Sequence, residues 1–329
     1  MTELQRYLAE EVAEDLVDGI ITRREAMRRL GVLGLTAAAA SSLLAAPASA
    51  RPGAAVAAPR TGRHGNGVVS SWAPVATEAI SFPGPRGTLL GAWAAAERSR
   101  GGVLVIHENR GLTDHIKTVA GRFAASGYSA LALDLLSEEG GTDALPDDTA
   151  RMAALNEAAL TPERFDTDMQ AAVTELLDRL PGQRVGAIGF CFGGGMIWRL
   201  LASGEDRLAA AAPFYGPFPE GGDLSRSRAA VLAVYGGLDD RVNATRDAAI
   251  AALQAAGARF EIVTFTNANH AFFNDTGDRF DAPAAAEAYR RTLGWFDRHV
   301  AKGHRRHGGH GHDDDDDHGR GRGRRGGDD

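Results

Sequence analysis

The chain has 329 residues, of which 44% are hydrophobic, and its 36 Lys and Arg against 43 Asp and Glu give a formal net charge of −7. This length accommodates one large α/β domain or two small ones, and the mild negative charge argues against nucleic acid as a partner. The only cysteine is Cys191, which excludes an internal disulfide framework.

The N-terminal 50 residues have the order of an export signal. An amphipathic helix with no assigned chemistry is predicted first, from apolar residues at near-helical spacing: Leu4, Leu8, Val12 and Leu16. The basic run 22–29 follows and resembles a twin-arginine signal, with Ala26 where the usual pattern has Phe. A weakly apolar run over 30–46 then leads to Ala48-Ser-Ala50, an A-x-A cleavage site.

We therefore expect residues 1–50 to be a twin-arginine-like signal peptide that is cleaved after Ala50, and residues 51–74, rich in Gly, Ala, Pro and Arg, to be a linker. The apolar run is short and rich in alanine for a membrane-spanning helix, so no stable membrane anchor is expected after cleavage. The mature protein would begin near Arg51 and work in the periplasm or outside the cell, with the twin-arginine export machinery as a partner.

Residues 75–302 alternate short apolar runs with helical patterns. The predicted strands are 102–107, 129–133, 185–190, 209–214, 230–235 and 260–265. The clearest helix has Thr161 as N-cap and Pro162 as its first residue, with the apolar stripe Met169, Ala172, Val173, Leu176, Leu177 and Leu180. Such alternation predicts an α/β fold with a mostly parallel central sheet and helices on both faces. The looser stretch 137–160 is either a cover over the site or a surface excursion.

Cys191 stands in Gly189-Phe-Cys-Phe-Gly193, between a predicted buried strand and a predicted helix. This is the position of a nucleophile on the sharp strand-to-helix turn of the G-x-S-x-G pattern. A buried structural cysteine does not explain the glycines on both sides, which leave room where a Cβ would clash. The helix N-terminus would favour a thiolate and an adjacent oxyanion.

A base and an orienting acid are expected further along the chain. One predicted strand ends at Gly236-Gly-Leu-Asp-Asp240 and a later one at Asn267-Ala-Asn-His270, which gives the order nucleophile, acid, histidine. Of the two acids we choose Asp239, which comes first in the G-x-x-D-x-x-V frame, and expect Asp240 to be solvated or to cap a helix. An earlier strand end carries Glu108 after His107, a carboxylate directed toward the thiol.

These segments together resemble the dienelactone hydrolase family, over about residues 77–300. The resemblance rests on His107-Glu-Asn-Arg-Gly111, Gly189-Phe-Cys-Phe-Gly-Gly194, Gly236-Gly-Leu-Asp239 and His270-Ala-Phe272. It implies an α/β-hydrolase fold and a carboxylic ester hydrolase of the carboxymethylenebutenolidase type, acting on a small ester or lactone without a cofactor or metal.

The resemblance also implies roles for individual residues. Cys191, Asp239 and His270 would form the catalytic triad, with an acyl-thioester intermediate. Glu108 would contact Cys191 in the resting state and release it when substrate binds. The backbone N–H groups of Asn109 and Phe192 would form the oxyanion hole.

Other features point elsewhere. Family members carry an arginine a few residues after the histidine, whereas this chain has Phe272-Phe-Asn-Asp-Thr276, which weakens the case for dienelactone itself. Glutamine amidotransferases also use a cysteine elbow, but their acid follows the histidine by two residues, where this chain has Phe272. An exported, non-catalytic binding protein with a metal-binding tail is the remaining alternative. The tail, 303–329, is expected to be disordered and has five of the ten histidines and a run of aspartates.

Overall fold

The protein is described by a computed structural model that covers residues 1–45 and 73–301. The predicted cleavage site, nearly all of the predicted linker and the whole C-terminal tail lie outside the described residues, so the expectations for them stay predictions.

Eight strands form one sheet in the order β1-β2-β4-β3-β5-β6-β7-β8. The first two strands pair antiparallel at one edge, and β3 to β8 run parallel to one another. Every residue of the central strands β3, β4 and β5 is buried, as expected for a parallel sheet covered on both faces. The strands are β1 (Glu78–Gly84), β2 (Gly87–Ala94), β3 (Gly102–Ile106), β4 (Ser129–Asp134), β5 (Val185–Phe190), β6 (Leu208–Phe214), β7 (Ala230–Gly236) and β8 (Phe260–Phe265).

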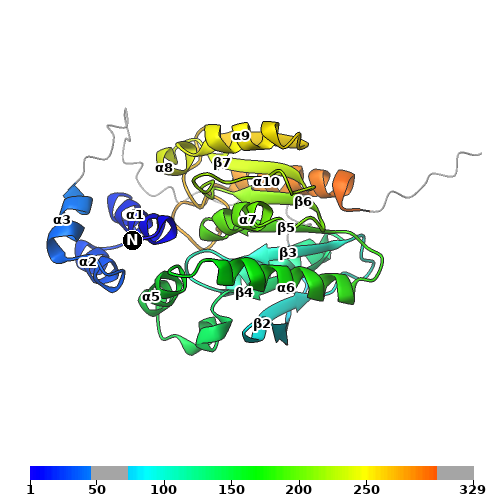
Figure 1. Ribbon diagram of the computed structural model, residues 1–329, viewed down its shortest axis with the longest axis horizontal. Helices are drawn as coiled ribbons and strands as arrows, with labels where there is room; N and C mark the ends of the chain where they lie inside the picture. The colour runs from blue at the N-terminus through cyan, green and yellow to red at the C-terminus, as the bar shows by residue number, and fades with distance from the viewer. Residues whose placement is uncertain (46–72, 302–329) are drawn as a thin grey trace, which may run out of the picture.

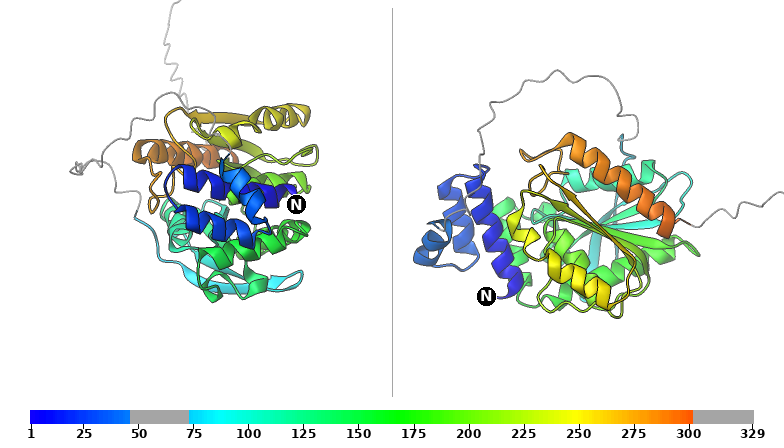
Figure 2. Two further views of the ribbon diagram at one scale, coloured as in Figure 1. Left: turned by 90° about the vertical axis from the view of Figure 1, so that its left-hand side faces the viewer. Right: turned by 90° about the horizontal axis from the view of Figure 1, so that it is seen from above.

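Helices cover both faces of this sheet (Figures 1 and 2). α6 and α7 pack together on one face, and α4 and α10 meet on the other, where the ring centroids of Phe123 and Phe296 are 5.8 Å apart. The helices after β3 are α4 (Asp114–Ala125), α5 (Asp148–Ala158), α6 (Glu163–Arg179), α7 (Phe192–Ala202), α8 (Asp240–Asn243), α9 (Arg246–Ala255) and α10 (Ala282–His299), with 3-10 turns at Ser137–Glu139 and Thr142–Ala144.

The start of α6 corrects one expectation. Thr161 was expected to be the N-cap, but the N-cap is Pro162, whose φ and ψ are already helical, and no side chain caps the helix. The backbone N–H of Thr161 instead donates to Ala158, because the preceding helix ends in a turn that leads directly into α6. The predicted apolar stripe does face the sheet, and Met169, Val173 and Leu176 are fully buried.

The N-terminal residues form three helices, α1 (Glu3–Val17), α2 (Arg23–Val32) and α3 (Ala37–Ala45). A capping box between Thr2 and Gln5 starts α1, and the Thr22 side chain caps α2. α1 lies directly against the domain at the end of the sheet that carries the active-site loops, and α3 lies on the outside (Figures 1 and 2). Within the described part of the chain, no helix has the length and apolar character needed to cross a membrane.

Candidate active site

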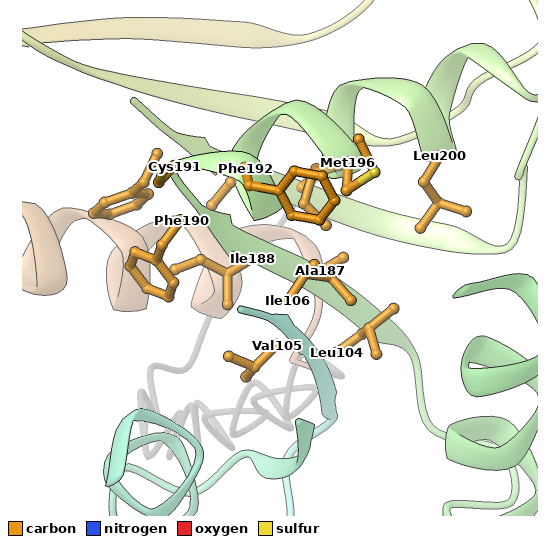
Figure 3. Close-up of a cluster of buried hydrophobic side chains, with 14 of the residues drawn as sticks. Leu104, Val105, Ile106, Ala187, Ile188, Phe190, Cys191, Phe192, Met196 and Leu200 are labelled. Carbon is orange, nitrogen blue, oxygen red and sulfur yellow. The ribbon is translucent and has the colours of Figure 1, made fainter. Parts of the chain in front are cut away.

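Cys191 occupies a strained turn between β5 and α7. Its backbone has φ 56° and ψ −120°, a conformation that costs energy for a residue with a Cβ and that marks functional turns. Figure 3 shows Phe190, Cys191 and Phe192 where the strand passes into the helix. A Cβ on Gly189 would lie 2.1 Å from the carbonyl oxygen of Gly193, and one on Gly193 would lie 2.4 Å from that of Ile106. Glycine is therefore required at both positions.

Asp239 and His270 come together at the same end of the sheet, after β7 and β8. The Oδ2 of Asp239 lies 2.6 Å from Nδ1 of His270, while its Oδ1 accepts the N–H of Val242 and so caps α8. The Cys191 sulfur lies within 4.8 Å of a ring nitrogen of His270. Asp240 is exposed and is the first residue of α8. The structure thus places Asp239, not Asp240, against the histidine.

The thiol and the imidazole are held in protonated forms in this arrangement. Burial, then the charge of Glu11, raises the pKa of Cys191, although His270 lowers it. Burial alone would lower the pKa of His270, but the carboxylates of Glu11 and Asp239 raise it well above its usual value. The resting site therefore pairs a neutral thiol with an imidazolium.

Glu108 and Asn109 follow β3 and line the same cavity as Cys191. Glu108 Oε2 accepts a hydrogen bond from Asn274 Nδ2 at 2.7 Å, and its Oε1 has no hydrogen-bond partner among the described residues. No hydrogen bond joins Glu108 to Cys191 within the described ranges, although the charge of Glu108 contributes to the raised pKa of the thiol. Asn274 stands in the segment where an arginine was missing.

Phe192 is the first residue of α7, so its backbone N–H has no acceptor within the helix. It follows the nucleophile directly, which is where an oxyanion donor is needed. Asn109 lies beside Cys191 on the wall of the cavity, on the opposite loop. Both residues thus lie in the loops around Cys191, and the role of their N–H groups stays a prediction.

Helix α1 adds side chains that the sequence analysis did not assign to the site. The Tyr7 hydroxyl lies 3.3 Å from the Cys191 sulfur, and Glu11 Oε1 lies 3.2 Å from Nε2 of His270. Both side chains are buried. Tyr7, Glu11, Glu14 and Asp18 recur at helical spacing next to the apolar stripe of α1. This polar stripe is the feature of the sequence that could have indicated a role of α1 at the site.

Two arginines of the domain form ion pairs with the acidic residues of α1. Arg241 pairs with Glu11 and Glu14, and its guanidinium carbon lies 4.5 Å from the ring centroid of Tyr7. Arg279 donates to Asp15 at 3.0 Å and to Asp18 at 2.8 Å. Together these pairs attach α1 to the catalytic loops.

A cavity of about 210 Å³ remains between these elements. Cys191, Glu108 and Glu11 line it, with Met152 and Asp148 of α5 at its side. The loose stretch 137–160 therefore reaches the catalytic cavity, and its helix α5 packs against α1 and α2.

Two groups of side chains bring possible metal ligands within 4.8 Å of one another, namely Glu11, Cys191 and His270, and Glu14, Asp239 and His270. Both groups use the triad histidine. Arg241 contacts Glu11 and Glu14 and already supplies positive charge to these carboxylates. The donor set thus belongs to an ion-pair network around the triad, in which Arg241 is a positively charged partner of Glu11 and Glu14.

The sheet order and the strained turn after β5 define an α/β-hydrolase. Residues 89–300 match the model of the dienelactone hydrolase family. The chain belongs to this family, and it is a hydrolase. Helices α1 to α3 precede the matched residues.

Individual relatives agree with this assignment. A provisionally named carboxymethylenebutenolidase from Escherichia coli O157:H7 is 30% identical over 213 residues, which cover 61% of this chain and 78% of the relative. A provisionally named dienelactone hydrolase from Klebsiella pneumoniae is 25% identical, with a TM-score of 0.59 over 68% of this chain and 98% of that one. A dienelactone hydrolase-like promiscuous phosphotriesterase from metagenomic libraries is also 25% identical, with a TM-score of 0.61 over 69% and 100%.

Proposed function

We propose that the protein is an exported thiol hydrolase that cleaves a small ester or lactone with Cys191, His270 and Asp239. The observation that carries this proposal is the strained turn that places Cys191 within 4.8 Å of a ring nitrogen of His270, whose Nδ1 is bound by Asp239 at 2.6 Å. A nucleophile, a base and an orienting acid in this relation are what acyl transfer requires. A metal-binding carrier would need none of these positions.

The reaction begins when Nε2 of neutral His270 accepts the proton of the Cys191 thiol, and the Glu108 carboxylate, displaced by substrate, assists this transfer. The thiolate attacks the carbonyl carbon, and the N–H groups of Phe192 and Asn109 receive the oxyanion. When the tetrahedral intermediate collapses, the alcohol leaves with the proton from His270 and a thioester remains on Cys191. Water then loses a proton to His270, attacks the thioester and releases the acid, and the thiol is restored.

Glu108 gates the thiol in this proposal. Glu108 lines the same cavity as Cys191, and its charge favours the neutral thiol, because a second negative charge nearby disfavours thiolate. Substrate binding would move this carboxylate. A thiol protected in this way resists oxidation outside the cytoplasm.

Export by the twin-arginine route is supported by the sequence of residues 22–50. Arg23 and Arg24 begin α2 and are exposed, so a receptor can reach them on the folded chain. The periplasm or the extracellular space is the proposed location.

The enzymatic proposal is tested by hydrolysis of aryl esters and lactones, each with and without a carboxylate. The parent protein and its Cys191→Ala variant are compared before and after cleavage of the chain after Ala50. Turnover that depends on Cys191 supports the proposal, and equal turnover by both proteins refutes it. The preferred member of the panel identifies the substrate class.

A further inference from the structure

The N-terminal helix α1 occupies the catalytic centre with a tyrosine and a carboxylate. We propose that residues 1–45 are an intramolecular inhibitor of the hydrolase, and that separation of α1 from the domain after chain cleavage produces the active enzyme. This inference rests on the proposed function, because it assigns the same Cys191, His270 and Asp239 as the machinery that α1 blocks.

Glu11 blocks the base. The triad needs the lone pair of His270 Nε2 to accept the thiol proton, yet Glu11 Oε1 lies 3.2 Å from this nitrogen. Asp239 binds the other ring nitrogen at 2.6 Å, so the imidazole stands between two carboxylates. Two negative charges beside the ring favour its protonated form, and an imidazolium cannot act as a base.

Tyr7 blocks the nucleophile. Its hydroxyl is 3.3 Å from the Cys191 sulfur, and its ring is held under the guanidinium of Arg241. An acyl carbon that forms a bond to sulfur needs an approach of roughly 3–3.5 Å in its near-attack position. The Tyr7 hydroxyl already occupies a position at this distance, so substrate and α1 compete for the thiol.

Hydrogen bonds at both ends hold α1 against the domain. Arg279 and Asn269 both contact Asp18 at the end of α1, and Asn269 precedes the triad histidine. At the other end, Gln5 donates to the carbonyl oxygen of Asn156 and Thr2 to that of Ala159. Leu8 and Val12 of α1 are fully buried. The polar contacts at both ends fix the register that aligns Glu11 with His270.

The connection between inhibitor and enzyme runs through residues 46–72, where the predicted cleavage site lies. While the chain is intact, α1 is present at the high effective concentration of a tethered ligand. A cut after Ala50 leaves only non-covalent contacts, and dilution then favours dissociation. The precursor would thus be silent in the cytoplasm, and removal of the signal would uncover the site.

The first experiment uses the full chain with a specific protease sequence inserted after Ala50. Ester hydrolysis and alkylation of Cys191 by iodoacetamide are measured before and after the cut, with gel filtration to show that residues 1–50 have separated. Both rates are expected to rise at least about tenfold, because the base and the thiol become accessible together. A peptide of residues 1–45 should restore inhibition, and the same peptide with Glu11→Gln should not.

The second experiment keeps the chain intact, so it holds even if the cut fragment stays bound. Glu11→Gln retains the shape of the side chain and removes its charge, and it is expected to raise ester hydrolysis at neutral pH about tenfold. Glu10→Gln is the matched control. Glu10 precedes Glu11 on α1 and has no hydrogen bond or ion pair with the triad within the described residues. Unchanged hydrolysis by Glu11→Gln would refute the blocking of His270 by Glu11.

The outcomes separate this inference from the proposed function. Hydrolysis that is the same before and after separation of the fragment keeps the hydrolase and refutes the inhibitor. If alkylation becomes faster after the fragment has separated but no ester is hydrolysed, α1 does block Cys191, and ester or lactone cleavage is refuted. Hydrolysis that falls when α1 leaves would make α1 a working part of the site and also refutes the inhibitor.

Discussion

The carboxylate of Glu11 and the imidazole of His270 form a buried ion pair, with Glu11 Oε1 3.2 Å from Nε2. The two residues are far apart in the chain and belong to different parts of it, α1 and the loop after β8. The same nitrogen must take the proton of Cys191 during catalysis. The activity of the enzyme therefore depends on whether Nε2 of His270 pairs with the Glu11 carboxylate or accepts the proton of the Cys191 thiol.

This pair predicts the pH dependence of the intact chain. Burial lowers the pKa of His270, but Glu11 and Asp239 raise it well above its usual value, so the neutral base forms at higher pH than in a free imidazole. Hydrolysis should rise with pH in the intact chain, and Glu11→Gln should move this rise to lower pH. Other titratable and charged groups near His270, such as Cys191, Arg241 and Glu14, are the same in both proteins. The measurement is the rate of hydrolysis against pH for the intact chain and for Glu11→Gln.

The same ion pair predicts how the stability of α1 docking changes with pH. A raised folded-state pKa of His270 contributes stability that is complete below its unfolded pKa of about 6.5 and is lost as pH rises through the folded value. Burial raises the pKa of Glu11, but His270 and Arg241 lower it below its usual value. The stability that Glu11 contributes to docking is therefore complete above a pH of about 4.5. Hydrogen exchange of α1 should therefore be slowest, after correction for intrinsic rates, between these two limits. Protection that increases toward alkaline pH would contradict the pairing.

Asp239→Asn should reduce turnover by about four orders of magnitude, as loss of the orienting acid does in a triad. The Asn side chain can still cap α8 at Val242, so the fold should persist. Asp240→Asn, the matched control, changes an exposed neighbour and should cost little. Steady-state rates for both variants, with thermal unfolding as a check, decide between the two acids. The opposite ranking would move the acid to Asp240.

Glu108→Gln should leave alkylation of Cys191 as fast as in the parent or faster, because a negative charge near the thiol is lost. Hydrolysis should fall, since the displaced carboxylate can no longer help to take the thiol proton. Glu108 also accepts a hydrogen bond from Asn274, which the amide can retain. Alkylation rates against pH, measured on folded protein, test this role. Identical profiles for both proteins would remove Glu108 from the mechanism.

Replacement of Arg23 and Arg24 by Lys should block export if the twin-arginine route is used. Both side chains are exposed on α2, so the folded precursor should accumulate in the cytoplasm with normal stability. Arg28→Lys is a control in the same helix, outside the arginine pair. Mass spectrometry of the fraction outside the cytoplasm should find a mature N-terminus near Arg51. A product that retains residues 1–50 would instead indicate an anchored or cytoplasmic protein.

The central sheet could be predicted because its strands are continuous apolar runs. The expected strand Val185–Phe190 matches β5, and the expected α/β fold is confirmed. The β1–β2 hairpin was not predicted, because edge strands such as Glu78–Gly84 are largely exposed and mix polar, proline and glycine residues. Local patterns identify buried strands better than exposed ones.

The position of Asp239 could be inferred from its loop frame, and the strain at Cys191 from the flanking glycines. The role of α1 could not, because its chemistry exists only when Tyr7 and Glu11 meet Cys191 and His270 across the whole fold. The export-like residues that follow also favoured a leader with no chemistry of its own. Contacts between such distant segments leave no local periodicity in the sequence.

The most direct test of the central claim is the capture of the acyl-enzyme. The chain cut after Ala50 is mixed with an aryl ester that deacylates slowly, quenched in acid and analysed by peptide mass spectrometry. We expect the acyl group on the peptide that contains Cys191 as a thioester that hydroxylamine removes, and no such adduct in Cys191→Ala. Rapid hydrolysis with an adduct elsewhere, or undiminished hydrolysis by Cys191→Ala, would contradict the assignment of Cys191 as the nucleophile.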